Sequence, residues 1–251
     1  MARKGLVAER LMATVDRLSA TLRTQSFGAP VTHVYNPLDY ARATHHEFLE
    51  RFSHRRPEVL LLGMNPGPWG MAQTGIPFGA IPPVRDWLSI SRHAADAIGH
   101  PTDEHPKRPI QGFDCQREEV SGARLWGWAR DTYGTPERFF EQFFVYNYCP
   151  LIFLEASGRN RTPDKLPAEE RNRLFAPCDE ALRDTVEILG VERVIGIGAF
   201  AEKRASMVIE NLPVDRILHP SPASPAANRG WSAAVKRQLE AIGISPPSRS
   251  L

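Results

Sequence analysis

The sequence predicts a three-layer α/β/α fold around a central, mostly parallel, four-stranded sheet. Short apolar runs alternate along the chain with longer amphipathic segments, and this alternation is typical of parallel strands joined by crossover helices. The runs are bounded by Gly, Pro or polar residues and have the length of strands that are buried on both faces. We expect strands at 59–62, 143–147, 193–197 and 216–218.

The segments between these runs predict the helical layers. Apolar residues recur at helical spacing over 6–22, so an amphipathic helix is expected there. A further short strand is expected at 31–35, and surface loops at 100–112 and 155–167. Further helices are expected at 40–52, 84–90, 124–133, 136–142, 168–189, 199–209 and 232–242. No linker or repeat divides the 251 residues, which we interpret as a single domain, 1–251.

Composition excludes several classes of protein. The net charge of +2 does not by itself indicate a nucleic-acid binder, although it is compatible with a local basic face. The three cysteines form no CxxC pair, which argues against a zinc finger or a four-cysteine cluster, and we expect neither metal nor cofactor. No run approaches the ~20 apolar residues of a membrane span, and no signal peptide is recognisable. We therefore expect an intracellular protein that is neither secreted nor membrane-bound.

The stretch 60–80 organises the rest of the chain. The apolar run 59–62 leads directly into Gly and Pro residues that allow neither helix nor ladder, and Asn65 is the one polar side chain at this bend. Asn147 and His219 also stand at or just after the ends of expected strands. Because the carboxyl ends of parallel strands meet at one edge of a sheet, we expect these three side chains to converge there. The structural alternative for the stretch is a simple strand-end turn.

Five segments together resemble one family. They are GMNPGPWGMAQTGIPFG at 63–79, EVSGARLWG at 119–127, FVYNYCPL at 144–151, SGRNRTP at 157–163 and HPSPASPAANRGW at 219–231. In this order they resemble the signatures of single-strand-selective monofunctional uracil-DNA glycosylases, over about 27–239. The resemblance implies a uracil-DNA glycosylase-like fold and a DNA repair enzyme that hydrolyses the N-glycosidic bond of uracil, leaving an abasic site for base excision repair. It implies a location in the cytoplasm or nucleoid of a bacterium, or in the nucleus of a eukaryote.

The resemblance also assigns catalytic roles to two of the convergent residues. Asn65 falls where the family positions the attacking water, and its carbonyl oxygen can orient water although an amide cannot take a proton from it. His219 falls at the family's catalytic histidine, which donates to uracil O2 as negative charge develops there. From the residue alone, His219 is more often a structural hydrogen-bonding group than a catalyst.

The same resemblance places the base-binding residues. An amide such as that of Asn147 pairs with uracil N3–H and O4, whereas cytosine presents the opposite pattern. Phe78 supplies a stacking face, although from the residue alone a core aromatic is equally compatible. The Met64 backbone N–H is a second donor to O2. Gly67 and Met71 line the C5 side of the base, which implies that 5-hydroxymethyluracil is a substrate, and xanthine and hypoxanthine remain open as substrates.

The expected partner is uracil-containing DNA, single- or double-stranded, bound by a monomer. Contacts to DNA are expected from Ser221, Pro222, Ala223, Ser224, Asn228 and Arg229. Arg159 and Arg161 add positive charge, although without the motifs separate arginines indicate only a solvated surface. Related vertebrate proteins carry Arg where this chain has Ala223, within the wedge that enters the helix. No Lys lies in 63–79 or 146–151, so a Schiff-base nucleophile has no candidate there and a monofunctional enzyme is expected.

Three other functions are compatible with parts of the sequence. A non-catalytic lesion-binding protein of the same fold is the main alternative, and the presence of Asn65, Asn147 and His219 argues against it. A small-molecule hydrolase does not account for the basic, Pro- and Ser-rich segment 219–231. A nucleotide-binding protein would depend on the GxG at 196–198, which lacks a third correctly spaced glycine.

Overall fold

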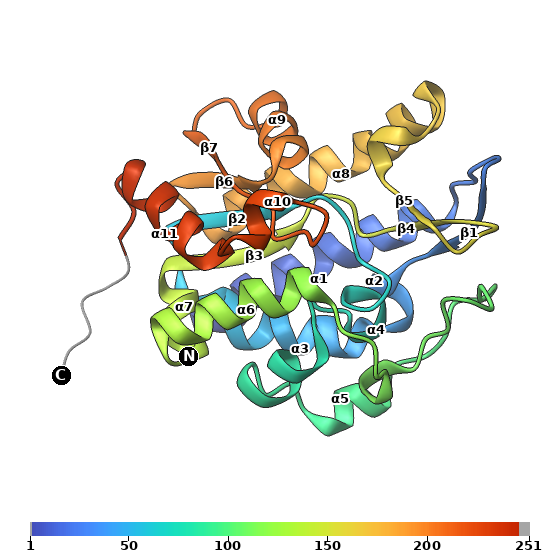
Figure 1. The fold of residues 1–251 in the computed structure, drawn as a ribbon, viewed down its shortest axis with the longest axis horizontal. Coiled ribbons are helices and arrows are strands. Elements are labelled where there is room, and N and C mark those ends of the chain that lie inside the picture. Colours follow the sequence, from blue (N-terminus) through green and yellow to red (C-terminus); the bar gives the residue numbers. More distant parts are fainter. Residues whose placement is uncertain (1, 246–251) are drawn as a thin grey trace.

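A four-stranded parallel sheet forms the centre of the computed structural model, which describes residues 2–245 (Figure 1). Its strands lie in the order β3-β2-β6-β7. Their bounds are Val59–Gly63 for β2, Phe143–Asn147 for β3, Arg193–Ile197 for β6 and Val214–Ile217 for β7. Every residue of β2 and β3 is buried, as expected for a parallel sheet covered on both faces.

Helices cover both faces of this sheet. On one face, Phe144 packs against Phe48, and a Cβ added to Gly196 would lie 2.1 Å from the backbone nitrogen of Glu202. On the other face, Phe143 packs against Trp128. The first layer contains α1 (Ala2–Arg23), α3 (Arg42–Phe52), α8 (Ala168–Leu189) and α9 (Ala199–Val208), and the second α6 (Val120–Tyr133) and α11 (Trp231–Ala241). The expected three-layer α/β/α fold is therefore confirmed.

Short helices connect these layers. Thr135 caps α7 (Pro136–Gln142), because its side chain accepts a hydrogen bond from the Arg138 N–H and proline occupies the first turn. The expected helix at 84–90 is a shorter π-helical turn at Pro83–Trp87. The remaining helices and turns are α2 (Pro37–Tyr40), α4 (Met71–Thr74), α5 (Arg92–Asp96), α10 (Pro225–Asn228) and the 3₁₀ turns Ser53–Arg55, Gly112–Asp114 and Pro163–Lys165.

A second, antiparallel sheet corrects one expectation. Strands β1 (Val31–Tyr35), β4 (Ile152–Glu155) and β5 (Asn160–Arg161) lie in the order β1-β4-β5. The segment 155–167 is thus not a plain loop, since it contains β5 and a 3₁₀ turn. The hairpin closes at Gly158, whose φ of +82° lies in the left-handed region. The β1–β4 pairing joins segments far apart in the chain, and local patterning carries no signal for it.

Candidate active site

A cavity of about 350 Å³ opens at the carboxyl edge of the parallel sheet. Gly63 and Asn147, which end β2 and β3, are paired in register, and Asn147 and the segment that follows Gly63 form part of the cavity wall. The lining residues are Met64, Asn65, Pro66, Gly67, Met71, Phe78, Glu119, Ser121, Asn147, Asn160, Thr162, His219 and Ser221. The structure therefore brings together both expected catalytic residues and all five expected base-binding residues.

Asn147 presents an incompletely bonded amide to this cavity. The residue is only 5% exposed, and its Nδ2 donates to the Met71 sulfur at 3.2 Å. Its Oδ1 is buried and has no hydrogen-bond partner within residues 2–245. A Cβ on Gly63 would lie 2.2 Å from this oxygen, so a glycine is required beside it. A buried acceptor without a partner is costly, and here it indicates a place for a ligand's donor.

The Phe78 ring forms an aromatic wall of the cavity. Phe78 has a φ of +54°, a left-handed conformation that is uncommon for residues other than glycine. The turn is held by α6, because Trp126 Nε1 donates to the Phe78 carbonyl at 3.1 Å. A Cβ on Gly122 would lie 2.0 Å from that same carbonyl oxygen, which explains the glycine in the 119–127 motif. The helix thus holds the ring in place without occupying the cavity.

His219 lies on the loop after β7, close to Phe78. The two ring centroids are 6.2 Å apart, and a Cβ on Gly198 would lie 3.2 Å from the His219 Cβ. Burial lowers the pKa of His219 below its usual value of 6.5. The imidazole is therefore neutral near pH 7, with one ring nitrogen carrying a proton to donate.

Asn65 uses one end of its amide to fix its orientation. Its Nδ2 donates to the Leu151 carbonyl at 3.3 Å. Within the described chain, no residue donates to its Oδ1, and the residue lines the cavity. This arrangement leaves the amide oxygen as an acceptor for a water molecule.

Four polar lining residues were not assigned roles from the sequence. They are Glu119, Ser121, Asn160 and Thr162. Burial raises the pKa of Glu119, while hydrogen bonds from Ser121 and from the Trp69 backbone oppose that rise. Asn160 Nδ2 donates to the Pro66 carbonyl at 3.0 Å, and its Oδ1 is buried without a partner in the described part of the chain. The only sequence signal for these residues was their place inside the quoted motifs.

The loop that carries His219 is held by hydrogen bonds between its own residues. Ser221 Oγ accepts from the Ala223 N–H at 3.1 Å, and Ser224 Oγ accepts from the Ala227 N–H at 3.3 Å. Asn228 Nδ2 donates to the Pro222 carbonyl at 2.9 Å. The side chains expected to bind phosphate thus also hold the loop in shape, whereas Pro222, Ala223 and Arg229 are exposed.

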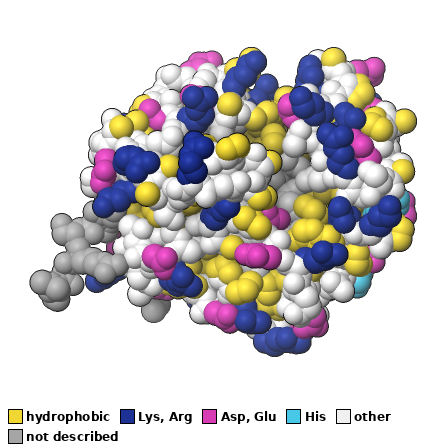
Figure 2. All heavy atoms as spheres, viewed as in Figure 1, with side chains coloured by type: hydrophobic (Ala, Val, Ile, Leu, Met, Phe, Trp, Pro, Cys, Tyr) yellow, Lys and Arg dark blue, Asp and Glu magenta, His cyan; other side chains and the backbone are white. Residues whose placement is uncertain are grey.

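One arginine connects this loop to α6, and a second arginine is paired within the neighbouring hairpin. Arg124 of α6 donates to the Pro220 carbonyl at 3.1 Å and to Asn228 Oδ1 at 2.8 Å. Arg161, expected to add charge for DNA, forms an ion pair with Glu155 at 3.0 Å and is only partly exposed. Lys and Arg side chains gather on both sides of a hollow in the face that carries α10 (Figure 2).

Within residues 2–245, no group of three or more His, Cys, Asp or Glu side chains is placed to hold a metal ion. None of the described helices is both long and apolar enough to cross a membrane.

Comparisons with known proteins define the class first. The family model described as "Uracil DNA glycosylase superfamily" matches residues 50–241. The crystal structure of wild-type SMUG2 from Pedobacter heparinus is similar with a TM-score of 0.64 at 19% identity, covering 92% of this chain and 97% of that one. This structural likeness supports the fold alone.

Closer relatives define the family. The single-strand-selective monofunctional uracil-DNA glycosylases of Rattus norvegicus and Mus musculus are each 47% identical over 244 residues, which cover 96% of this chain and 86% of the relative. The Bos taurus protein of the same name is 46% identical and is covered to 88%. The chain belongs to the family of single-strand-selective monofunctional uracil-DNA glycosylases, within the uracil-DNA glycosylase superfamily.

Proposed function

We propose that this chain is a monofunctional DNA glycosylase that removes uracil from DNA and leaves an abasic site for base excision repair. The observation that carries the proposal is the amide of Asn147, whose buried Oδ1 has no partner among residues 2–245 and faces a cavity that also holds Asn65, Phe78 and His219. Family membership supports the same activity.

The base is recognised after it leaves the helix. An extruded uracil stacks on Phe78 in the cavity. Asn147 Oδ1 accepts from N3–H, and Nδ2, now shared with the Met71 sulfur at 3.2 Å, donates to O4. Cytosine presents an acceptor at N3 and a donor at its exocyclic amine, so it faces two mismatched groups and is rejected.

Bond breaking is stabilised at both ends. The C1′–N1 bond breaks with its electron pair on the base, and His219 with the Met64 N–H donates to O2 of the departing anion. Asn65 Oδ1 orients a water whose oxygen bonds C1′ of the electron-poor sugar, and the water's proton passes to solvent. A neutral imidazole suits this role, because its ring N–H can donate a hydrogen bond to O2 while the ring itself stays uncharged.

The finer features of the substrate form part of the proposal. Gly67 and Met71 leave room at C5 for 5-substituted uracils such as 5-hydroxymethyluracil. The exposed residues of the loop 219–231 lie against DNA, single- or double-stranded, and the enzyme acts as a monomer without metal or cofactor.

The test is a cleavage assay on oligonucleotides containing one uracil, in single- and double-stranded form and with EDTA present. We expect free uracil and a strand that breaks only after alkali treatment. Borohydride should trap no protein–DNA adduct, because no lysine lines the described cavity. A trapped adduct would contradict the monofunctional mechanism, and intact strands after alkali would contradict the activity.

A further inference from the structure

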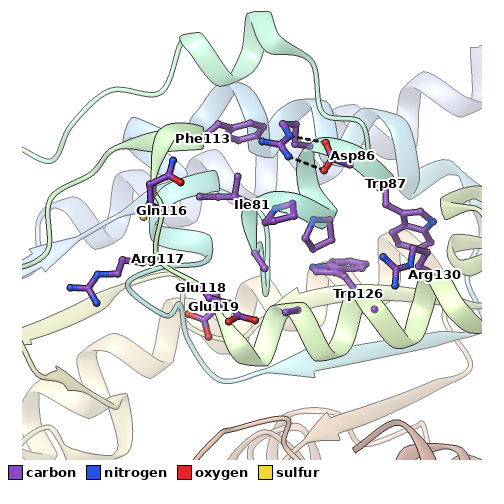
Figure 3. A pocket seen from close by; sticks show the side chains of 17 residues that line it. Ile81, Asp86, Trp87, Phe113, Gln116, Arg117, Glu118, Glu119, Trp126 and Arg130 are labelled. Atoms are coloured by element: carbon purple, nitrogen blue, oxygen red, sulfur yellow. Dashed lines mark hydrogen bonds and ion pairs between the residues drawn. The ribbon is translucent and has the colours of Figure 1, made fainter.

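Glu119 is the one carboxylate among the described residues that line the base cavity. It stands immediately before α6 and also lines a second, neighbouring cavity of about 630 Å³. Figure 3 shows Glu119 beside Glu118 at the start of the helix, with Trp87, Phe113 and Trp126 around the second cavity. The mechanism above uses no carboxylate, so this half-buried acid has no role in it.

The position of Glu119 relative to the base follows from the Asn147 amide. Asn147 Nδ2, the donor for O4, points to the Met71 sulfur, so the O4 edge of the base lies toward Met71. C5 is bonded to C4 and therefore lies on this same side of the cavity. Gly67, Gly70 and Met71 form one continuous backbone turn there, and the Ala72 N–H donates to the Gly67 carbonyl.

Glu119 packs directly on that turn. A Cβ on Gly67 would lie 2.4 Å from Glu119 Oε2, and a Cβ on Gly70 would lie 2.7 Å from Glu119 Cγ. The absence of side chains at these two glycines therefore lets the carboxylate approach the C5 side of the cavity. Ser121, through its N–H and its hydroxyl, and the Trp69 N–H hold the carboxylate in place.

The carboxylate has acceptor capacity left for a ligand. An ionised carboxylate offers about four lone-pair sites and no donor. Ser121 and the Trp69 backbone are donors to this carboxylate, and Glu119 also lines the base cavity, where a donor on a ligand can reach it. We infer that Glu119 accepts a hydrogen bond from a donor group on C5 of the flipped base, such as the hydroxyl of 5-hydroxymethyluracil, and so determines specificity among 5-substituted uracils. This inference rests on the proposed function.

The test compares two isosteric variants on three bases. Glu119→Gln keeps the shape of the side chain but replaces one acceptor by a donor, and Glu118→Gln makes the same change at an exposed neighbour that lines only the second cavity. Single-turnover excision rates are measured for uracil, 5-hydroxymethyluracil and 5-formyluracil in the same single-stranded oligonucleotide. The readout is each rate relative to uracil, which cancels any general loss of active protein.

We expect Glu119→Gln to lower the 5-hydroxymethyluracil-to-uracil ratio by about tenfold or more, the size of a lost hydrogen bond to a charged group. The 5-formyluracil ratio should rise, because the formyl oxygen only accepts and the new amide can donate to it. Glu118→Gln should leave both ratios unchanged.

Two results would overturn the inference while leaving the proposed function intact. The first is an equal fall in all three rates, which would make Glu119 a positioning residue for the turn at Gly67. The second is unchanged ratios in Glu119→Gln. Failure of the unaltered chain to excise uracil would instead overturn the proposed function, and the inference with it.

Discussion

The polar side chains of the base cavity and those of the loop 219–231 differ in whether they have hydrogen-bond partners. In the cavity, Oδ1 of Asn147 and Oδ1 of Asn160 are buried without partners in the described chain. In the loop, Ser221, Ser224 and Asn228 are bonded to nearby backbone. Unpaired buried groups gain most when a ligand arrives, whereas paired surface groups gain little. Substitutions in the cavity should therefore affect chemistry, and substitutions at the exposed loop positions should affect only DNA affinity.

The sharpest test of this difference is to remove the two catalytic side chains. We expect His219→Ala and Asn65→Ala each to slow single-turnover uracil release by roughly 100- to 1000-fold, because losing one preorganised donor costs about 2.7–4 kcal/mol at comparable sites. DNA binding, measured by fluorescence anisotropy, should change far less. His93→Ala removes an exposed imidazole and serves as the control. A near-normal rate in His219→Ala would remove that residue from the mechanism.

A smaller effect is expected from Asn147→Asp, because it changes the reading of the base without removing the catalytic groups. The carboxylate keeps an acceptor but loses the donor to O4, so uracil excision should slow by roughly tenfold or more. If the buried acid is protonated, its O–H can donate to cytosine N3, and slow cytosine release should appear. Rates on uracil- and cytosine-containing oligonucleotides measure both effects.

The matched change in the loop is Asn228→Asp. It places a carboxylate beside Arg124, which already donates to this side chain, and it should leave the uracil-to-cytosine preference unaltered. A shift in base preference for Asn228→Asp as large as that for Asn147→Asp would contradict the assignment of base reading to the cavity and of DNA affinity to the loop.

Some parts of the fold could be predicted from the sequence, and others could not. The strands β2, β3 and β6 consist mostly of apolar residues, so both their position and the convergence of Asn65, Asn147 and His219 could be predicted. The β4–β5 hairpin could not, because its pairing with β1 depends on residues more than a hundred positions away. Helix α6 begins at Val120 rather than at the expected 124, and its first turn includes Gly122, which packs against the Phe78 carbonyl.

The roles of individual polar atoms were the least predictable part. Glu119 and Asn160 appear in sequence as ordinary polar residues, and only the packing of the turn at Gly67 and of Pro66 shows that they line the cavity. Conversely, Ser221 and Ser224 fit a phosphate-binding pattern, although their hydroxyls accept from nearby backbone. Composition specifies which groups are polar, but burial decides which of them remain free to bind.

The smallest effect is expected at Ala223, where the loop meets DNA. Extruding a base leaves a hole in the duplex, and an inserted side chain stabilises the extruded state by filling it. Ala223 is exposed and its contact with Ser221 uses only its backbone N–H, so a longer side chain fits without disturbing the loop. Ala223→Arg should therefore tighten binding to double-stranded uracil or abasic DNA by a few-fold to about tenfold, and binding to single strands less, because single strands have no hole.

Equilibrium binding and single-turnover rates are the measurements for this variant, because tighter product binding slows multiple turnover. Arg229→Ala is the control, since it removes an exposed positive charge from the same loop and should weaken binding to both forms of DNA alike. An equal gain of Ala223→Arg on single and double strands would indicate phosphate attraction in place of insertion. No gain on either would mean that another loop fills the hole, or that position 223 does not enter the helix.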